Sequence, residues 1–192
     1  MTIRNVLPRS RAAAAAAAAV AGAALALVAA LPATPASAIG GSFGNPTSST
    51  LVNVNSGKCL EIADWRTDNG APARQWDCTG GANQLWDYVP DNGGFELVNR
   101  FSGKCLEIAD WSHEYGAPAR QWDCTWGGNQ HWNYAGTLGD RGELGIANFN
   151  SAMMLEIADW RTDNGAPARQ WPGSYAGVAQ ANQAWITAIK RY

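Results

Sequence analysis

Beyond Ala38, the chain has no long apolar run and no excess of basic side chains. The whole sequence contains 14 Lys and Arg against 16 Asp and Glu. Arg4, Arg9 and Arg11 belong to the start of the chain, so the rest has eleven basic and sixteen acidic residues, a net charge of −5. Nucleic acids and anionic lipids prefer basic surfaces. We therefore expect no nucleic-acid partner, and no membrane insertion by residues 39–192.

Residues that carry out metal or nucleophilic chemistry are also scarce. The only histidines, His113 and His131, are far apart along the chain, and no Cys-x-x-Cys pair occurs. The usual spacing of zinc ligands is therefore missing. We expect both histidines to be isolated and exposed, with no metal and no cofactor bound. His-Glu-x-x-His and phosphate-loop motifs are absent too, and acids repeated in three copies are unlike a single catalytic pair, so we expect no enzyme.

The segment 1–38 has the three parts of a secretory signal peptide. A basic start is followed by an alanine-rich apolar run from Ala12 to Leu31 and by the small-x-small pattern Ala36-Ser37-Ala38. We expect cleavage after Ala38 and a secreted, extracellular protein. A retained membrane anchor is the alternative, because the apolar run is long enough to span a bilayer. Residues 39–50, rich in Gly, Ser and Thr, are expected to be a flexible lead-in.

One sequence motif occurs three times in residues 39–192. The stretch 60–76, LEIADWRTDNGAPARQW, recurs letter for letter at 155–171, and a near copy occupies 106–122. Each copy is followed by Asn-Gln-x-Trp, which defines units of about 51–90, 97–136 and 144–188. Units of this size cannot bury an apolar face alone and must pack against each other.

Within a unit the pattern predicts strands and turns. Leu60-Glu61-Ile62 alternates apolar and polar residues, while Asn69-Gly70 is typical of a turn. Four short strands in each of three units predict an all-β closed architecture. The closing tryptophans of Asn-Gln-x-Trp are expected in its core; these are Trp86, Trp132 and Trp185.

The spacing of the four cysteines predicts their pairing. Two cysteines 19 positions apart occur at the same place in units one and two, which predicts Cys59–Cys78 and Cys105–Cys124. Each bond is expected to add about 3 kcal/mol of stability. Zinc binding by these thiols is the weaker alternative, because the sequence has no Cys-x-x-Cys pair and no cluster of histidines. Unit three has Met154 and Gly173 at these places, together with an insertion containing Tyr175.

The three units resemble the ricin B-chain-type lectin domain and are similar to family 13 carbohydrate-binding modules. The resemblance rests on Cys-Leu-acid-aliphatic, Gly-x₅-Trp-x-Cys and Asn-Gln-x-Trp in register, and covers nearly all of residues 51–192. It implies a β-trefoil of twelve strands with pseudo-threefold symmetry. It also implies non-catalytic binding of galactoside-, xylan- or arabinan-type glycans at up to one shallow site per unit. We expect a monomer that binds polysaccharide or cell-surface glycan by multivalency and binds single sugars weakly.

The resemblance also implies which residues contact sugar. Each unit offers an acid, a stacking tryptophan, an asparagine and an assisting glutamine. These are Glu61, Trp76, Asn83 and Gln84; Glu107, Trp122, Asn129 and Gln130; and Glu156, Trp171, Asn182 and Gln183. Strand packing is the alternative role for these tryptophans, and bonding of turn backbone for the glutamines. Trp126, which stands where unit one has Gly80, is expected to enlarge the apolar floor of the second site.

Two departures from the family's pattern allow more than one role for the residues of each site. The family's acid is usually Asp, and an arginine precedes each stacking tryptophan by two positions: Arg74, Arg120 and Arg169. Arginine can pair with the glutamate beside a bound sugar, pair with it in place of sugar, or contact sugar itself. A second acid either caps the following turn or replaces the glutamate as site acid; these are Asp64, Asp110 and Asp159. Paired, closed sites favour the alternative function, a protein-binding or inhibitor-like trefoil.

Overall fold

The computed structural model describes residues 48–91, 93–138, 142–173 and 179–189. These residues form twelve β-strands and five one-turn 3-10 helices, with no α-helix among them. No helix in these ranges has the length and apolarity of a membrane span. The expected leader, most of the lead-in and the unit-three insertion with Tyr175 lie outside the described residues.

Each unit supplies four strands, as its pattern predicts. Unit one has β1 Ser49–Asn53, β2 Cys59–Ile62, β3 Ala73–Trp76 and β4 Trp86–Asp91. Unit two has β5 Gly94–Asn99, β6 Cys105–Ile108, β7 Ala119–Trp122 and β8 His131–Leu138. Unit three has β9 Glu143–Asn148, β10 Met154–Ile157, β11 Ala168–Trp171 and β12 Ala184–Ile189. Strand β1 begins before the expected start of unit one because Ser49 and Thr50 pair with the end of β12.

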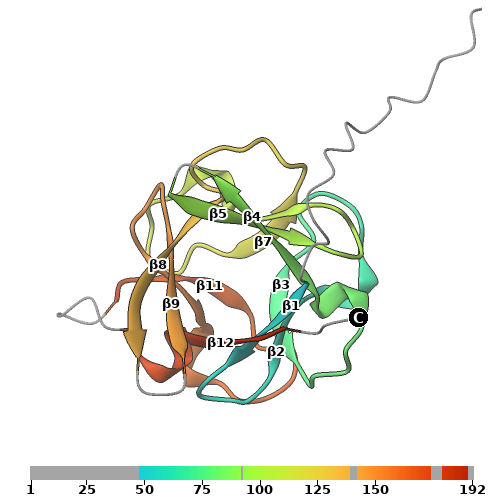
Figure 1. The fold of residues 1–192 in the computed structure, drawn as a ribbon, viewed down its shortest axis with the longest axis vertical. Coiled ribbons are helices and arrows are strands. Elements are labelled where there is room, and N and C mark those ends of the chain that lie inside the picture. The colour runs from blue at the N-terminus through green and yellow to red at the C-terminus, as the bar shows by residue number, and fades with distance from the viewer. Residues whose placement is uncertain (1–47, 92, 139–141, 174–178, 190–192) are drawn as a thin grey trace, which may run out of the picture. The chain divides into compact units, whose positions relative to one another are not determined.

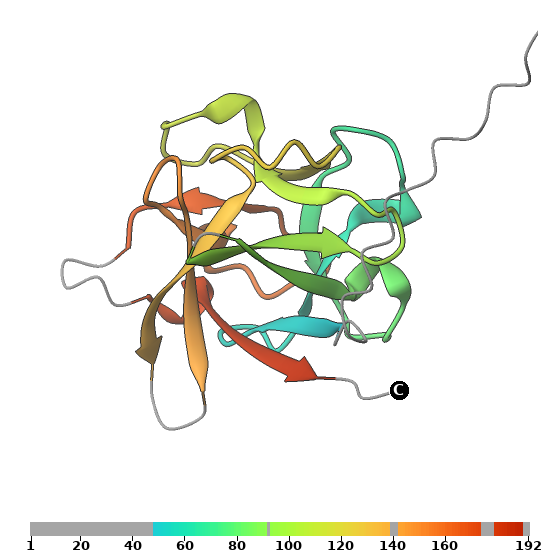
Figure 2. The ribbon, with the colours of Figure 1, turned by 45° about the horizontal axis from the view of Figure 1, so that its top comes forward.

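The strand pairing closes a six-stranded barrel. Strand β1 pairs with β4, β4 with β5, β5 with β8, β8 with β9, β9 with β12, and β12 with β1. The other six strands form three hairpins, β2–β3, β6–β7 and β10–β11. Figures 1 and 2 show β1, in cyan, beside β12, in red, where the barrel closes. The predicted β-trefoil is confirmed.

The core lies where the three units meet. The closing tryptophans are fully buried, and the indole Nε1 of Trp86 donates to the carbonyl of Leu60 at 3.1 Å, as its counterparts do in the other units. Leu60 and Ile62 point into the same core, whereas Glu61 between them points to the other face of β2. The predicted core role of Trp86, Trp132 and Trp185 is confirmed.

Contacts between units explain why the phrase occurs three times. The turn at Gly70 donates its backbone N–H to Gln121 of unit two at 2.9 Å. In the same way Gly116 donates to Gln170 of unit three, and Gly165 donates to Gln75 of unit one. Each unit thus donates a backbone hydrogen bond to one neighbour and accepts one from the other. This ring of hydrogen bonds closes only with three units.

The two predicted disulfides, Cys59–Cys78 and Cys105–Cys124, are present. Unit three replaces the bond by packing, because a Cβ on Gly173 would lie 3.2 Å from Cε of Met154. The methionine side chain therefore occupies the space that the second cysteine fills in the other units.

Candidate functional site

The glutamate of each unit is buried and held by three donors. Oε1 of Glu61 accepts from Nε of Arg74 at 2.9 Å. Its Oε2 accepts from Nδ2 of Asn83 at 3.2 Å and from Nε2 of Gln84 at 3.1 Å. The same bonds recur around Glu107 and Glu156. Both carboxylate oxygens are therefore engaged by protein, and the expected pairing of arginine with glutamate is present in all three units.

The arginine links this buried acid to an exposed one. Nη2 of Arg74 donates to Oδ1 of Asp64 at 2.9 Å, and the Asp64 side chain is 70% exposed. Arg120 and Arg169 repeat the contact with Asp110 and Asp159. Burial alone lowers the pKa of Arg120, but its hydrogen bonds to Glu107 and Asp110 outweigh this and raise the pKa above its ordinary value. The guanidinium therefore stays charged between its two acids.

The same guanidinium lies over the tryptophan that is expected to stack on sugar. Cζ of Arg74 is 4.5 Å from the ring centroid of Trp76. The matching distance is 4.6 Å for Arg120 over Trp122, and also for Arg169 over Trp171. This is a cation–π contact. The guanidinium thus occupies one face of the indole.

A tight turn carries the exposed aspartate outward. Asp64 and Trp65 follow β2 in a one-turn 3-10 helix, with left-handed φ values of 55° and 54°. Two successive non-glycine residues of this kind are strained, and Asp tolerates the conformation better than most side chains. The hydrogen bond described for the Asp64 side chain comes from Arg74, and none among the described residues joins it to the turn that follows. The turn repeats in all three units.

Beside each buried acid of units two and three lies a hollow between two indoles, here named the Trp–Trp hollow. In unit two it measures about 240 Å³ and is lined by Glu107, Asp110, Trp111, Arg120, Trp122, Thr125 and Asn129. In unit three it measures about 220 Å³ and is lined by Glu156, Asp159, Trp160, Arg169, Trp171, Gln180 and Asn182. Unit one has the same residue types at the matching positions, except Gly81 in place of Gln180.

The asparagine and glutamine have different surroundings. Gln84 is buried, and its Oε1 accepts from the backbone of Thr79 while its Nε2 binds Glu61 and the carbonyl of Asp77. Asn83 also gives its N–H to Glu61, but its Oδ1 is buried without a partner among the described residues. The same oxygen lacks a partner in Asn129 and Asn182. Such an atom is expected to bind water or a ligand hydroxyl.

One tryptophan in each unit was not predicted as a site residue from the sequence. Trp65, Trp111 and Trp160 are about half exposed. Trp111 and Trp160 line the Trp–Trp hollows. A Cβ on Gly81 would lie 2.8 Å from the Trp65 ring, so this glycine leaves room for the indole. The available signal was the threefold repetition of Asp-Trp directly after the buried strand.

Two expectations about individual side chains were wrong. His131 is not exposed: it is buried, and its Nδ1 lies 3.0 Å from Oε1 of Glu96. Trp126 does not extend the floor of the Trp–Trp hollow in unit two; it lines a separate hollow with His131. His113 is exposed, as expected.

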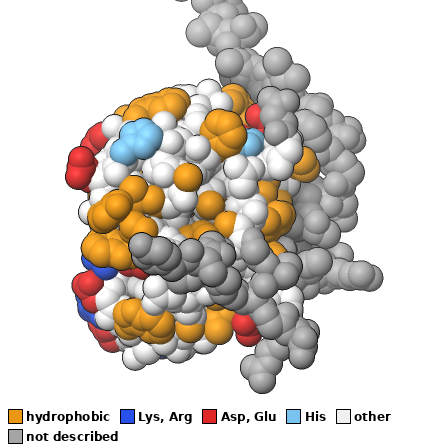
Figure 3. All heavy atoms as spheres, turned by 90° about the vertical axis from the view of Figure 1, so that its left-hand side faces the viewer, with side chains coloured by type: hydrophobic (Ala, Val, Ile, Leu, Met, Phe, Trp, Pro, Cys, Tyr) orange, Lys and Arg blue, Asp and Glu red, His pale blue; other side chains and the backbone are white. Residues whose placement is uncertain are grey.

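Exposed aromatic side chains are distributed over the surface. Figure 3 shows one face, on which hydrophobic side chains form several patches separated by polar surface. The large exposed hydrophobic residues include Trp65, Trp111, Trp126, Trp160 and Trp171. The face in Figure 3 thus offers scattered hydrophobic patches rather than one continuous apolar area.

Comparison with known proteins agrees with this architecture. The family model of ricin-type beta-trefoil lectin-like domains matches residues 41–122 and, in a second register, 88–171. The chain therefore belongs to the ricin-type β-trefoil lectin-like family.

Two solved structures are similar over most of the trefoil. ThreeFoil, a designed 3-fold symmetric protein, is 31% identical with a TM-score of 0.69, covering 76% of this chain and 99% of its own. The exo-beta-1,3-galactanase 1,3Gal43A from Clostridium thermocellum is 32% identical with a TM-score of 0.69, covering 75% of this chain and 30% of its own.

A curated relative is similar over a shorter stretch. Serine protease 1 from Rarobacter faecitabidus is 47% identical over 36 residues, which are 19% of this chain and 7% of that protein. The match therefore spans only a small part of the protease.

Proposed function

We propose that this protein is a secreted, non-catalytic lectin that binds polysaccharide or cell-surface glycan through the Trp–Trp hollows. The observation that carries the proposal is the hollow itself. It combines two indoles with an exposed carboxylate, an arginine and an asparagine whose Oδ1 lacks a partner among the described residues. Aromatic faces hold the C–H faces of a sugar, and charged and amide groups bind its hydroxyls.

The two acids of each hollow have different contacts, and we propose a different role for each. Glu107 already accepts three hydrogen bonds from protein, so in this proposal it shapes the site without touching sugar. Asp110 has one oxygen on Arg120 and a largely exposed side chain. We assign the role of sugar acceptor to Asp110 and its counterparts Asp64 and Asp159. Arginine pairing then coexists with binding, the first of the three arrangements left open by the sequence.

The contacts of the glutamates support the absence of catalysis. The glutamates accept hydrogen bonds from protein donors on both oxygens, whereas a catalytic acid or base has to reach the reacting group of a substrate. Residues 40–44, Gly-Gly-Ser-Phe-Gly, do match the Gly-x-Ser-x-Gly pattern of hydrolase nucleophiles. That motif functions only on a strand–turn–helix in an α/β fold, and these residues lie outside the described part of the chain.

A protein-binding trefoil is the alternative function, and arginine–glutamate pairing is the observation that favours it. Against it, the hollows beside the paired groups remain open. We further propose a monomeric, extracellular state with galactoside-, xylan- or arabinan-type ligands. The part of one exo-beta-1,3-galactanase that aligns with this chain is 32% identical to it, which makes galactan the first polysaccharide to test.

Binding to immobilised polysaccharide tests the proposal. We expect the wild type to be retained by galactan, xylan or arabinan. Trp111→Ala should weaken the affinity of the unit-two site by roughly tenfold, since stacking contributes about 1 kcal/mol or more, and should reduce retention of the whole protein a few-fold. Affinity electrophoresis measures the effect. Trp126→Ala is a matched control, because it removes an exposed tryptophan that lines a separate hollow and not a Trp–Trp hollow. Failure of the wild type to bind any glycan contradicts the proposal.

A further inference from the structure

One cross-strand position has different chemistry in the three units. Glu96 on β5 pairs with His131 on β8, whereas the equivalent pair in unit three is Gly145 with Ala184. In unit one the matching residues are Thr50 and Leu85. An ionisable pair therefore occurs in one unit only, and the threefold sugar sites do not require it.

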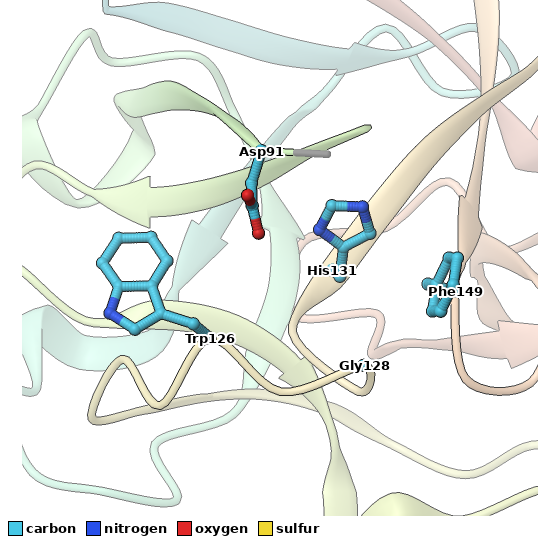
Figure 4. A pocket seen from close by; sticks show the side chains of 5 residues that line it. All are labelled: Asp91, Trp126, Gly128, His131 and Phe149. Carbon is cyan, nitrogen blue, oxygen red and sulfur yellow. The ribbon is translucent and has the colours of Figure 1, made fainter. Parts of the chain in front are cut away.

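A third ionisable group reaches this pair from the neighbouring strand. Val89 on β4 is the direct partner of Glu96, and Asp91 lies two residues further along the same strand. Residues two apart share a face of a strand. Ligand atoms of Asp91, Glu96 and His131 all lie within 4.8 Å of one another. Figure 4 shows the Asp91 carboxylate directed toward the His131 ring.

The buried carboxylate of this cluster lacks a partner for one oxygen and lies close to a second carboxylate. Glu96 is 0% exposed, and its Oε2 has no hydrogen-bond partner within the described part of the chain. Its Oε1 has the imidazole of His131, but the second carboxylate, Asp91, lies close by. A buried carboxylate is costly unless it is paired, and two adjacent carboxylates repel. A divalent cation would neutralise both and supply the missing partner of Oε2.

We propose that Asp91, Glu96 and His131 bind a divalent transition-metal ion of the zinc type. Two carboxylate oxygens and one imidazole nitrogen form a mixed ligand set suited to zinc, whereas calcium and magnesium prefer oxygen alone. Ligand atoms around tetrahedral zinc are about 3.4 Å apart, given bonds of about 2.1 Å. The separations of up to 4.8 Å therefore have to contract, and half-buried Asp91 at the end of β4 has room to move.

The surroundings orient the histidine and leave one side open. Phe149 contacts the His131 ring edge to face, with centroids 5.2 Å apart. A hollow of about 190 Å³, lined by Asp91, Trp126, Gly128, His131 and Phe149, adjoins the three ligands (Figure 4). Water in this hollow completes the fourth position of a tetrahedral ion. The expectation of no metal relied on the histidines being isolated in sequence, which does not hold for His131 in the fold.

Zinc titration of the chelator-treated protein tests the site. Isothermal titration calorimetry with Zn²⁺ is expected to show one ion per chain with a dissociation constant in the micromolar range. Co²⁺ is expected to give visible absorption bands typical of four or five ligands. The variant Glu96→Thr/His131→Leu copies the buried pair of unit one and is expected to bind Zn²⁺ about 100-fold more weakly.

Two further variants keep the test decisive. His113→Gln removes the other histidine, which is exposed and outside the cluster, and is expected to leave zinc affinity unchanged. Asp91→Asn alters only the half-buried ligand, and is expected to weaken binding about tenfold even if the double variant does not fold. Absence of stoichiometric binding by the wild type overturns the proposal. Equal affinity of the wild type and Asp91→Asn, or loss of affinity in His113→Gln, overturns it as well.

Discussion

Replacing Glu107 with alanine is expected to lower the free energy of unfolding by about 3–5 kcal/mol, because it leaves a buried network without its acceptor. Arg120, Asn129 and Gln130 all donate to this one carboxylate. The N–H groups of buried Asn129 and Gln130 would lose this acceptor, and a buried donor without a partner is costly. Urea denaturation followed by tryptophan fluorescence measures the loss.

The matched variant is Asp110→Asn. We expect it to leave the free energy of unfolding nearly unchanged and to weaken glycan binding. The asparagine keeps the size of the side chain and tolerates the left-handed backbone at φ 56°. Exposed ion pairs contribute about 0–1 kcal/mol, so the stability should change little. Glycan affinity of this site should fall roughly tenfold, because the charged acceptor is lost. Unchanged stability of Glu107→Ala, or full glycan affinity of Asp110→Asn, contradicts the assigned roles.

Changing the aspartates of all three units to asparagine is expected to reduce retention on polysaccharide about 100-fold or more, whereas each single change reduces it only a few-fold. Three weak sites on one rigid body gain from multivalency, so two remaining sites still hold a polymer. Binding to soluble and immobilised forms of the same glycan measures both effects. The triple variant is Asp64→Asn/Asp110→Asn/Asp159→Asn.

The control for this experiment changes three other exposed aspartates. Asp68, Asp77 and Asp163 pair with lysine or arginine on the surface and do not line the hollows of units two and three. Replacing them by asparagine removes the same charge, and retention should remain close to wild type. A single variant that loses as much retention as the triple variant would show that one site dominates, against the multivalent account.

The trefoil itself could be predicted because its evidence is periodic. Equal cysteine spacing predicted the disulfides, alternation at Leu60 and Ile62 predicted the core face of β2, and the closing tryptophans predicted the core. These features depend on residues close in sequence or related by the repeat. Copying a unit copies its local structure, so the inference needed no knowledge of distant contacts.

The division of roles between Glu61 and Asp64 could not be predicted in the same way. It depends on a one-turn helix with two left-handed residues, which turns Asp64 outward. In units two and three the tryptophan of the same turn lines the Trp–Trp hollow. The pairing of Glu96 with His131 joins strands 35 residues apart, and neither residue belongs to the repeated phrase. Non-local pairing of single side chains leaves no period in the sequence.

A crystal structure of the protein soaked with the oligosaccharide of a retained glycan is the most direct test of the central claim. The account predicts sugar in the Trp–Trp hollow of unit two, between Trp111 and Trp122, with a hydroxyl bound to Asp110. Glu107 should keep its bonds to Arg120, Asn129 and Gln130. Sugar bound directly to Glu107 with Arg120 displaced, or bound outside the Trp–Trp hollows, would contradict the account.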